Sequence, residues 1–428
     1  MPTSNIEHPT RNGPRLLVIG YVWPEPASSA AGYRMLALLD AFNCAGWEIT
    51  FASPAKTSVH RANLAARGIR EQAIALNCHS FDDFVTALQP AAVLFDRFMM
   101  EEQFGWRVEK CCPDALRILD TEDLFSLRHA RHEAFKQTGC IDVNVSRELL
   151  FSDTAKREIA SILRCDLALI ISEFEMQLLE GLFAVDPALL LHIPFMLPPV
   201  TETQQQNLPS YDAREHFIVI GNFRHAPNWD AVLYLKDALW PLIHHRLPEA
   251  ELHIYGAYPP KKATQLHNPR QGFMVKGWAE DAFEVIKKAR ISLAPLRFGA
   301  GLKGKLADAM ACGTPSVTTS IGAEGMGAER EWPGAISDEP RQFAEHAVAL
   351  YRNPQQWQHC QQLGFSLHNQ RFDFDTHAHT LINRVQVLRT QLNTHRLNNF
   401  TGAMLRHHSM KSTQYMAQWI EAKNRNKH

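Results

Sequence analysis

Residues 294–315 read Ala-Pro-Leu-Arg-Phe-Gly-Ala-Gly-Leu-Lys-Gly-Lys-Leu-Ala-Asp-Ala-Met-Ala-Cys-Gly-Thr-Pro, and they are the clearest indication of the fold class. An apolar run at 291–295 leads into closely spaced glycines, and a helical pattern at 305–311 follows at once. A buried strand that passes through a glycine loop into a helix is the repeating unit of α/β proteins. Because lysines stand inside the motif, the spacing is neither that of a P-loop nor that of the dinucleotide fingerprint.

The same stretch predicts a site for a nucleotide diphosphate. Gly299 and Gly301 would let backbone N–H groups approach phosphate oxygens, and the helix N-terminus adds partial positive charge. Lys303 and Lys305 supply full charges, and Asp308, one turn into the helix, would accept hydrogen bonds from ribose hydroxyls. A purely structural turn with solvated lysines and an exposed aspartate would have the same sequence, so that alternative stays open.

Two blocks of alternating strand and helix patterns make up most of the chain. In the first block, strands are expected at 15–20, 48–53, 91–96, 115–120 and 166–172, with a helix at 33–44. In the second block, strands are expected at 216–221, 251–256, 273–277, 291–295 and 315–319, with helices at 229–245, 281–288 and 305–311. This alternation predicts two Rossmann-like domains, each with a parallel sheet.

The proline-rich and polar segment at 194–209 is the clearest break between the blocks. The predicted parts are an N-terminal domain over 14–205, a C-terminal domain over 206–370, a terminal helix over 371–395 and a basic polar tail over 396–428. The tail contains Met404, Met410, Met416 and Trp419. These residues suit an amphipathic docking helix, a loosely packed terminal helix or a mobile segment.

Composition narrows the class of protein. A chain of 428 residues exceeds the limit of roughly 250–300 residues for one core, and its 45% hydrophobic content supports two. The 44 basic and 45 acidic residues give a net charge of −1, so no overall field attracts nucleic acid.

The apolar runs fall far short of the ~18 residues of a membrane helix, and residues 1–14 contain no readable secretory signal. The eight cysteines lack the spacing of a disulfide framework or a zinc ribbon. We therefore expect a cytoplasmic protein.

The segment Phe217–Met326 resembles the donor-binding domain of GT-B-fold glycosyltransferases, specifically the retaining family four ("glycosyl transferases group 1"). The resemblance rests on GNFRHAPNWDA at 221–231, LPEAELHIYG at 247–256, VKG at 275–277, the glycine-lysine stretch and IGAEGM at 321–326. The loop Gly-Ala-Gly-Leu-Lys-Gly-Lys is similar to that of a subgroup with the same fold. The first block resembles the family more loosely, through its opening strand and the segments at 24–34 and 45–50.

This resemblance implies two domains that face a cleft, with a C-terminal helix that crosses back to the first domain. It implies transfer of a sugar, with retention, from a nucleotide diphosphate sugar to an acceptor hydroxyl. The donor would bind mostly to the second domain, where Arg224 and Lys305 would stabilise the departing diphosphate. Further donor-binding residues would be Gly32, Gly221, Asn222 and Asn228.

One position departs from the family pattern. Asp308 lies where the family usually has the second glutamate of a two-glutamate motif. Ala300 stands eight residues earlier, where the family usually has the first glutamate, which is held to contact the donor sugar. The donor sugar and the stereochemistry therefore stay open.

Three carboxylates follow the predicted strand at 115–120, namely Asp120, Glu122 and Asp123. One of them would orient or deprotonate the acceptor hydroxyl, and Asp120 and Asp123 are the catalytic candidates. First-turn acids that cap a helix would give the same pattern.

No metal or cofactor is expected besides the nucleotide sugar as co-substrate. The acidic pair Asp373 and Asp375 and the histidines His377 and His379 open a terminal helix far from the nucleotide loop, so helix capping explains them better than metal binding does.

The predicted partners are a nucleotide-sugar donor and an acceptor that is a glycan, a lipid-linked precursor, a protein or a small molecule. The basic tail would contact the inner face of the membrane. Two other functions are compatible with the sequence. An epimerase of the same fold would need no acceptor, and a non-catalytic nucleotide-sugar-binding scaffold is favoured by Ala300.

Overall fold

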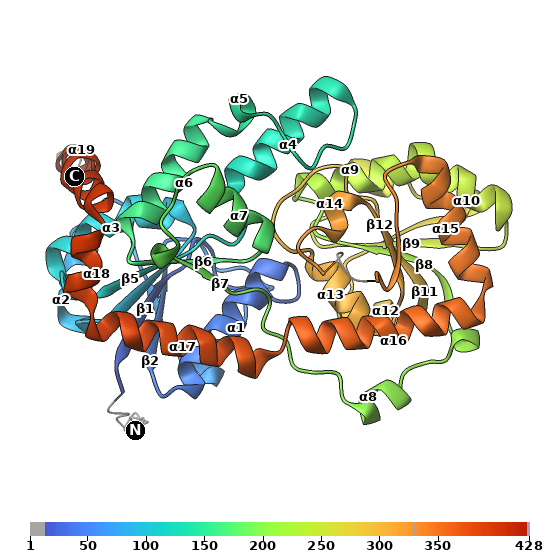
Figure 1. Ribbon diagram of the computed structural model, residues 1–428, viewed down its shortest axis with the longest axis horizontal. Helices are drawn as coiled ribbons and strands as arrows, with labels where there is room; N and C mark the ends of the chain where they lie inside the picture. The colour runs from blue at the N-terminus through green and yellow to red at the C-terminus, as the bar shows by residue number, and fades with distance from the viewer. Residues whose placement is uncertain (1–12, 328–330, 426–428) are drawn as a thin grey trace.

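The computed structural model describes residues 13–327 and 331–425, which form two α/β domains side by side (Figure 1). The first sheet has the order β3-β2-β1-β4-β5-β6-β7, and the second has the order β10-β9-β8-β11-β12-β13. Every strand pair in both sheets is parallel. The predicted fold class of two facing Rossmann-like domains is confirmed.

The strands of the first sheet are β1 (Arg15–Ile19), β2 (Glu48–Ser53), β3 (Arg70–Ala73), β4 (Ala92–Asp96), β5 (Leu116–Asp120), β6 (Leu167–Ile170) and β7 (Leu190–His192). The strands of the second sheet are β8 (Glu215–Ile220), β9 (Leu252–Tyr255), β10 (Phe273–Gly277), β11 (Ala289–Ala294), β12 (Ser316–Thr318) and β13 (Gly334–Ile336). The sequence analysis missed β3, β7 and β13. All three lie at the edges of the sheets, where a strand is short or partly exposed and its apolar pattern is weak.

The helices that cover the first sheet are α1 (Ala30–Cys44), α2 (Ser80–Leu88), α3 (Phe98–Cys111), α4 (Phe125–Thr138), α5 (Arg147–Leu150), α6 (Asp153–Arg164) and α7 (Glu173–Gly181). A short helix, α8 (Glu202–Gln206), lies between the domains in sequence. The helices of the second domain are α9 (Ala226–Tyr234), α10 (Trp240–Arg246), α11 (Lys261–Thr264), α12 (Ala282–Ile286), α13 (Gly304–Ala311), α14 (Ser320–Ala323), α15 (Pro340–Arg352) and α16 (Pro354–Arg371).

Helix α1 begins at Ala30 rather than at the predicted Tyr33. Its N-cap is Ser29, whose hydroxyl accepts a hydrogen bond from the Gly32 N–H at 3.1 Å. The loop after β1 is therefore shorter than expected, and the first turn of α1 reaches the interface between the domains.

Both faces of each central strand are buried. In β1, Leu16 and Val18 pack on one side of the sheet and Leu17 and Ile19 on the other, and all four are fully buried. This two-sided burial explains why the central strands are continuous apolar runs, which made them easy to predict.

The chain returns to the first domain after α16. Helix α17 (Phe374–Thr390) buries Leu381, Val385 and Leu388 in the same core cluster as residues of α1. Figure 1 shows α16 beneath the second domain and α17 beneath the first. The crossover expected from the resemblance is confirmed.

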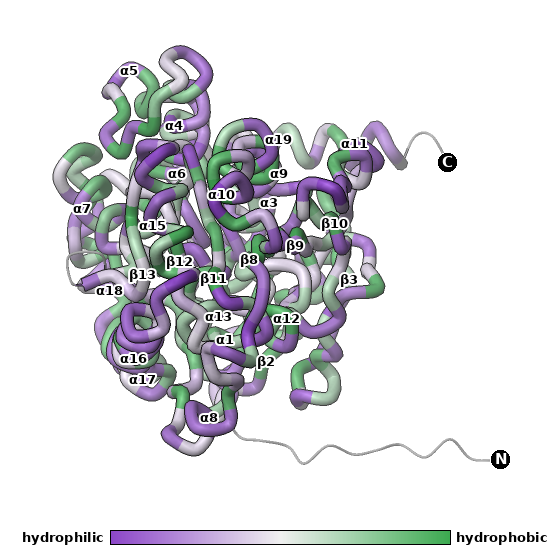
Figure 2. The backbone as a smooth tube through the Cα atoms, turned by 90° about the vertical axis from the view of Figure 1, so that its right-hand side faces the viewer, coloured by the Kyte–Doolittle hydropathy of each residue, from purple (hydrophilic) through white to green (hydrophobic). Residues whose placement is uncertain are grey.

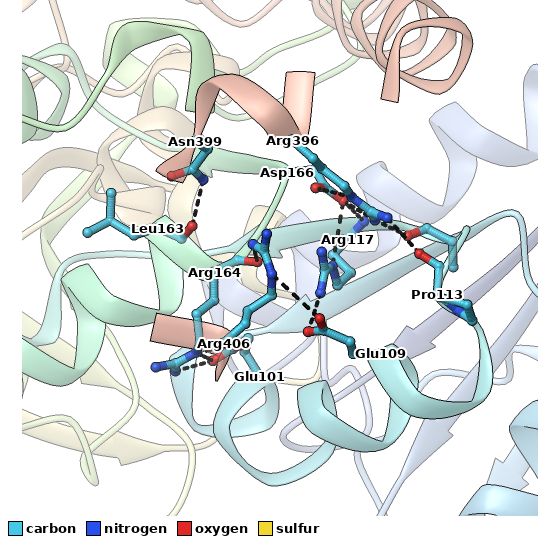
Figure 3. Close-up of polar contacts among 11 residues, drawn as sticks. Glu101, Glu109, Pro113, Arg117, Leu163, Arg164, Asp166, Arg396, Asn399 and Arg406 are labelled. Carbon is cyan, nitrogen blue, oxygen red and sulfur yellow. Dashed lines mark hydrogen bonds and ion pairs between the residues drawn. The ribbon is translucent and has the colours of Figure 1, made fainter. Parts of the chain in front are cut away.

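Two further helices follow, α18 (Leu392–Asn398) and α19 (Phe400–Arg425). Arg396 donates to the buried Asp166 and to the carbonyl oxygens of Pro113 and Ala115, at 2.6 to 2.8 Å (Figure 3). Arg406 donates to the Arg164 carbonyl oxygen at 3.1 Å. The region expected to be a polar tail is therefore helical from 400 to 425 and is attached to the first domain.

Hydrophobic and hydrophilic residues alternate along helix α19 (Figure 2), and several of its large apolar side chains are exposed. Met410 and Ala417 pack against Trp106 of α3, whereas Tyr415 and Trp419 are exposed. Within the described ranges, no helix combines the length and the apolar character that crossing a bilayer requires.

Candidate functional site

Loops from the carboxyl ends of strands in both sheets meet where the two domains touch. The Asn222 side chain, after β8, donates to the Ser28 carbonyl oxygen, after β1, at 3.4 Å. The Tyr258 hydroxyl, after β9, donates to the Glu25 carboxylate at 3.1 Å. Carboxyl ends of parallel strands are where open α/β sheets bind ligands. The candidate site is therefore the interface between the two strand-end loop clusters.

Four of the predicted donor-binding residues lie together in the second domain. Lys305 Nζ donates to Asn228 Oδ1 at 2.6 Å, and Asn228 Nδ2 donates to the Asn222 carbonyl oxygen at 3.0 Å. Gly221 faces both side chains, because a Cβ there would lie 2.7 Å from Asn228 Nδ2 and 3.0 Å from Lys305 Nζ. Gly221 thus makes room for the lysine and the asparagine.

Lys305 is a cation with a neutral partner. It is partly buried, and its hydrogen-bond acceptor is the amide oxygen of Asn228 rather than a carboxylate. Burial, followed by the repulsion of Lys303, lowers the pKa of Lys305 to about 8. A partly buried cation with no carboxylate in hydrogen-bond contact within the described chain is suited to binding an anion.

Asp308 lies one turn further along α13. Its carboxylate is partly buried and makes no hydrogen bond or ion pair with any described residue. Burial raises the pKa of Asp308 to about 7. Tyr33 of the first domain is close enough for Asp308 to raise the pKa of its phenol, second to the effect of burial. Asp308 is therefore an unsatisfied acceptor beside the domain interface.

The glycine-lysine loop is held by its own first lysine, Lys303. Lys303 is 8% exposed, and its Nζ donates to the carbonyl oxygens of Ala300 at 3.1 Å and Gly301 at 2.5 Å. Arg131 of the first domain donates to the Gly299 carbonyl oxygen at 2.9 Å. In this structure Lys303 orders the loop, and its predicted contact with phosphate stays a prediction.

Arg224 is exposed at the edge of the interface. Its guanidinium lies 3.7 Å from the centre of the Tyr258 ring, and its backbone N–H donates to Asn222 Oδ1 at 2.9 Å. The structure brings Arg224 beside the donor-binding group through its contact with Asn222.

Gly32 has a different environment from the one predicted. A Cβ at Gly32 would lie 2.5 Å from backbone atoms of Glu25, so the missing side chain makes room for the protein's own loop. The absent side chain thus serves the packing of residue 25, and the predicted contact of Gly32 with the donor stays a prediction.

The three acceptor-side carboxylates have different surroundings. Asp120 is fully buried and accepts from Arg34 Nε at 3.1 Å and Nη2 at 2.9 Å. Asp123 forms a short ion pair with Arg128. Asp120, a predicted catalytic residue, is therefore occupied by a buried arginine and is closed to solvent.

Glu122 is the carboxylate of this group that makes no hydrogen bond within the described chain. Its φ is +63°, and Arg97, after the neighbouring strand β4, has φ of +71°. Left-handed backbone at non-glycine residues is strained and is often found at functional sites. Burial, followed by the charge of Asp120, raises the pKa of Glu122 to about 8. Its place in the motif was the only signal that the sequence offered for it.

Sequence reasoning missed a buried ion pair that connects the domains. Arg131 of α4 donates to both carboxylate oxygens of Glu324, at 2.8 and 2.6 Å. The two residues lie 193 positions apart, so no local pattern could pair them.

No group of three or more His, Cys, Asp or Glu side chains within 13–327 and 331–425 is arranged to hold a metal ion. Asp373 caps α17, where its carboxylate accepts from the Thr376 N–H at 2.9 Å.

Residues 214–353 match the family described as "Glycosyl transferases group 1". Comparison with curated protein sequences finds no match. The structure of a sucrose-phosphate synthase from Thermosynechococcus elongatus aligns with 89% of this chain, over 100% of its own length, with 14% identity and a TM-score of 0.63. The structure of Anabaena HepE in complex with UDP-glucose aligns with 87% of this chain, over 100% of its own length, with 11% identity and a TM-score of 0.64.

A mutant of S. aureus TarM, in complex with fondaparinux, alpha-GlcNAc-glycerol and UDP, matches 71% of this chain with 12% identity and a TM-score of 0.54. This chain spans 58% of TarM. At these identities the likeness shows a shared fold, which is the GT-B arrangement of two α/β domains.

Proposed function

We propose that this protein transfers a sugar from a nucleotide diphosphate sugar to an acceptor hydroxyl. The observation that carries the proposal is the group of Lys305, Asn228 and the unpaired Asp308 at the strand-end edge of the second sheet. This group lies within the segment that matches "Glycosyl transferases group 1". The TarM and HepE structures of the same fold contain UDP or UDP-glucose, which supports a nucleotide-sugar donor here.

On the donor side, Lys305 would bind the diphosphate and Asp308 would accept hydrogen bonds from the ribose hydroxyls. As the sugar leaves, negative charge grows on the diphosphate, and a preorganised cation in a partly dry site stabilises that charge. Arg224, beside Asn222, would add a second cation. Transfer with retention and without a metal is part of the proposal and rests on the resemblance alone.

On the acceptor side, Glu122 is better placed than Asp120 to meet a hydroxyl. Both residues follow β5, but the Asp120 carboxylate already binds Arg34, whereas Glu122 is partly buried and has no described hydrogen-bond partner. With a pKa of about 8, Glu122 is mostly protonated at neutral pH and becomes a base as the pH rises. Asp123 stays a candidate for orienting the acceptor.

The first test is calorimetry and thermal unfolding of the protein with UDP, GDP, TDP, ADP and CMP and their sugars. A ligand that binds only the native state raises its stability, so one base should produce a clear shift. Lys305→Ala should reduce kcat/KM by the equivalent of about 2–4 kcal/mol, the value of one preorganised charge contact. Lys156→Ala is the matched control, because Lys156 is exposed on α6.

The outcomes separate the alternatives. Release of free nucleotide only when an acceptor is present supports transfer and excludes an epimerase. Nucleotide binding without turnover on a broad acceptor panel supports a scaffold. If no nucleotide or nucleotide sugar binds, the proposal is wrong.

A further inference from the structure

The carboxylate of Glu175 joins the two halves of the candidate site. Glu175 lies in the first turn of α7 and is fully buried. Its Oε1 accepts from the Leu124 N–H at 3.0 Å and from the Gly301 N–H at 3.0 Å. Leu124 ends the turn at 121–124 that carries Glu122 and Asp123, and Gly301 belongs to the glycine-lysine loop. One oxygen of the first domain therefore binds both loops.

The two loops are in direct contact at this point. A Cβ at Gly301 would lie 2.8 Å from Asp123 Cβ, and Gly301 has φ of +60°, which favours glycine. Ala300 is 7% exposed and packs in the second core cluster of the first domain. Position 300 thus attaches the loop to the other domain by an apolar contact, and Glu175 attaches it by a hydrogen bond.

Other groups complete the attachment. Lys303 Nζ donates to the Gly301 carbonyl oxygen, so Gly301 is bound on both sides of its backbone. Arg131 donates to the Gly299 carbonyl oxygen and to Glu324, which lies after α14. Of these contacts, the Glu175 hydrogen bond alone reaches both the loop at 299–303 and the turn at 121–124.

The chemistry of this contact requires an acceptor oxygen. Two buried N–H groups without an acceptor are costly, because water cannot reach them. Glu175 Oε2 has no hydrogen-bond partner in the described chain, and burial, followed by the charge of Asp123, raises the pKa of the carboxyl to about 8. A glutamine side chain also offers a carbonyl-type oxygen, so it can keep both bonds.

We propose that Glu175 is a positioning residue that fixes the loop at 299–303 against the turn at 121–124 in the closed arrangement of the domains. By doing so it sets the distance between the donor held by the second domain and the acceptor-side carboxylates of the first. This inference rests on the proposed function, because it assigns the two loops to donor and acceptor. Glu175 itself acts through the backbone of Leu124 and Gly301.

The test compares Glu175→Leu, which removes the acceptor oxygen at similar size, with Glu175→Gln, which keeps it. In Glu175→Leu, kcat for transfer should fall about 100-fold, the cost of misplacing reactants by about 1 Å. Its Kd for the nucleotide diphosphate found in the screen should stay within about threefold, which is under 1 kcal/mol. The Gly301 N–H binds Glu175 rather than a phosphate, which corrects the sequence prediction for this glycine, and Lys305, Asn228 and Asp308 lie in the second domain. Glu175→Gln should keep both quantities near those of the wild type.

Hydrogen exchange supplies a readout that needs no substrate. Peptides that cover 119–126 and 296–306 should exchange faster in Glu175→Leu and not in Glu175→Gln, because local opening exposes the two amides. If Glu175→Leu does not fold, Glu175→Asp replaces it, since the shorter side chain withdraws the oxygen from both N–H groups.

Unchanged exchange in both peptides would overturn the inference, and so would an unchanged kcat. Equal damage in the Gln and Leu variants would also overturn it, because charge rather than an acceptor oxygen would then be essential. A wild type that binds no nucleotide, with exchange as expected, would refute the proposed function and with it the catalytic role of Glu175, but not the attachment of the loops.

Discussion

Asp308 and Lys305 lie one turn apart on α13, and burial moves their pKa values towards each other. The pKa of Asp308 is raised to about 7 and that of Lys305 is lowered to about 8. Both groups are charged at the same time only between about pH 7 and 8, because each has left water without a hydrogen-bonded partner of opposite charge in the described chain. Ligand binding at this site should therefore depend on pH.

We expect the affinity for the donor sugar nucleotide to rise with pH through about 7, as Asp308 ionises, and to fall above about 8, as Lys305 loses its proton. Asp308→Asn should remove the acidic limb, and Lys305→Met should remove the alkaline limb. Calorimetry in steps of about half a pH unit, from about pH 5.5 to about pH 9.5, measures both limbs of the pH dependence. The sugar nucleotide is the right probe, because its diphosphate ester carries no titrating monoester proton. An affinity that does not change across this range would contradict both assignments.

At the scale of elements, the N-termini of α1 and α13 meet across the domain interface. A Cβ at Gly304, the first residue of α13, would lie 2.6 Å from Ala30 Cβ, the first residue of α1. Gly304 therefore lets the two helices approach each other. A larger side chain has to push the domains apart there, because helix backbone on both sides cannot yield.

Gly304→Val should keep the nucleotide affinity and lower kcat for transfer by about 100-fold, the cost of misplacing the reactants. Small-angle scattering should show a larger radius of gyration for the variant with donor bound. Gly181→Ala is the control, because a Cβ at Gly181 meets no described atom within 4 Å. Equal kcat in Gly304→Val and wild type would show that closure at this point is not needed.

At the scale of the whole molecule, the C-terminal helices belong structurally to the first domain. Arg396 is the centre of this attachment, since it binds the buried Asp166 and two carbonyl oxygens (Figure 3). Burial would raise the pKa of Asp166, but Arg396 and Arg117 outweigh burial, and the pKa lies below its ordinary value. The ion pair thus stabilises the fold above the pKa of an unfolded aspartate and loses this effect as the pH falls through the lowered pKa.

Arg396→Ala should lower the stability of the first domain by about 3–5 kcal/mol at neutral pH, because Asp166 stays buried without this partner. The loss should shrink at acidic pH, where Asp166 takes up a proton in both proteins. Thermal unfolding across pH measures the effect, and Arg246→Ala, from an exposed pair with Glu345, should change stability by less than about 1 kcal/mol. Equal losses in the two variants would contradict the role given to Arg396.

The outward face of α19 carries Tyr415 and Trp419, which are 65% and 59% exposed, beside Lys411 and Lys423. Aromatic and basic residues on one helix are typical of contact with a membrane surface. Contact of this segment with the inner face of the membrane stays a prediction, as does a cytoplasmic location.

Some of the molecule is determined locally and could be read from the sequence. The central strands of both sheets are buried on two faces, so each is a short apolar run that stands out against its neighbours, as Leu16 to Ile19 does. The positions around Lys303 and Lys305 have backbone and packing requirements that only small residues meet, so the glycines there indicated a loop. The resemblance to a family predicted one donor-binding group from residues distant in sequence, namely Gly221, Asn222, Asn228 and Lys305. The structure places these residues together.

Only the tertiary structure decided the parts that depend on partners far apart in the chain. Asp120 and Glu122 are both carboxylates at the end of the same strand, so the sequence does not distinguish them. In the structure Arg34 binds Asp120, whereas Glu122 has no hydrogen-bond partner in the described chain. Glu175, Arg131 and Glu324 showed no pattern at all, because their roles arise from contacts across the domain interface. The physical reason is that local pattern reports backbone preference and burial, whereas the charge state and availability of a side chain depend on which groups folding brings beside it.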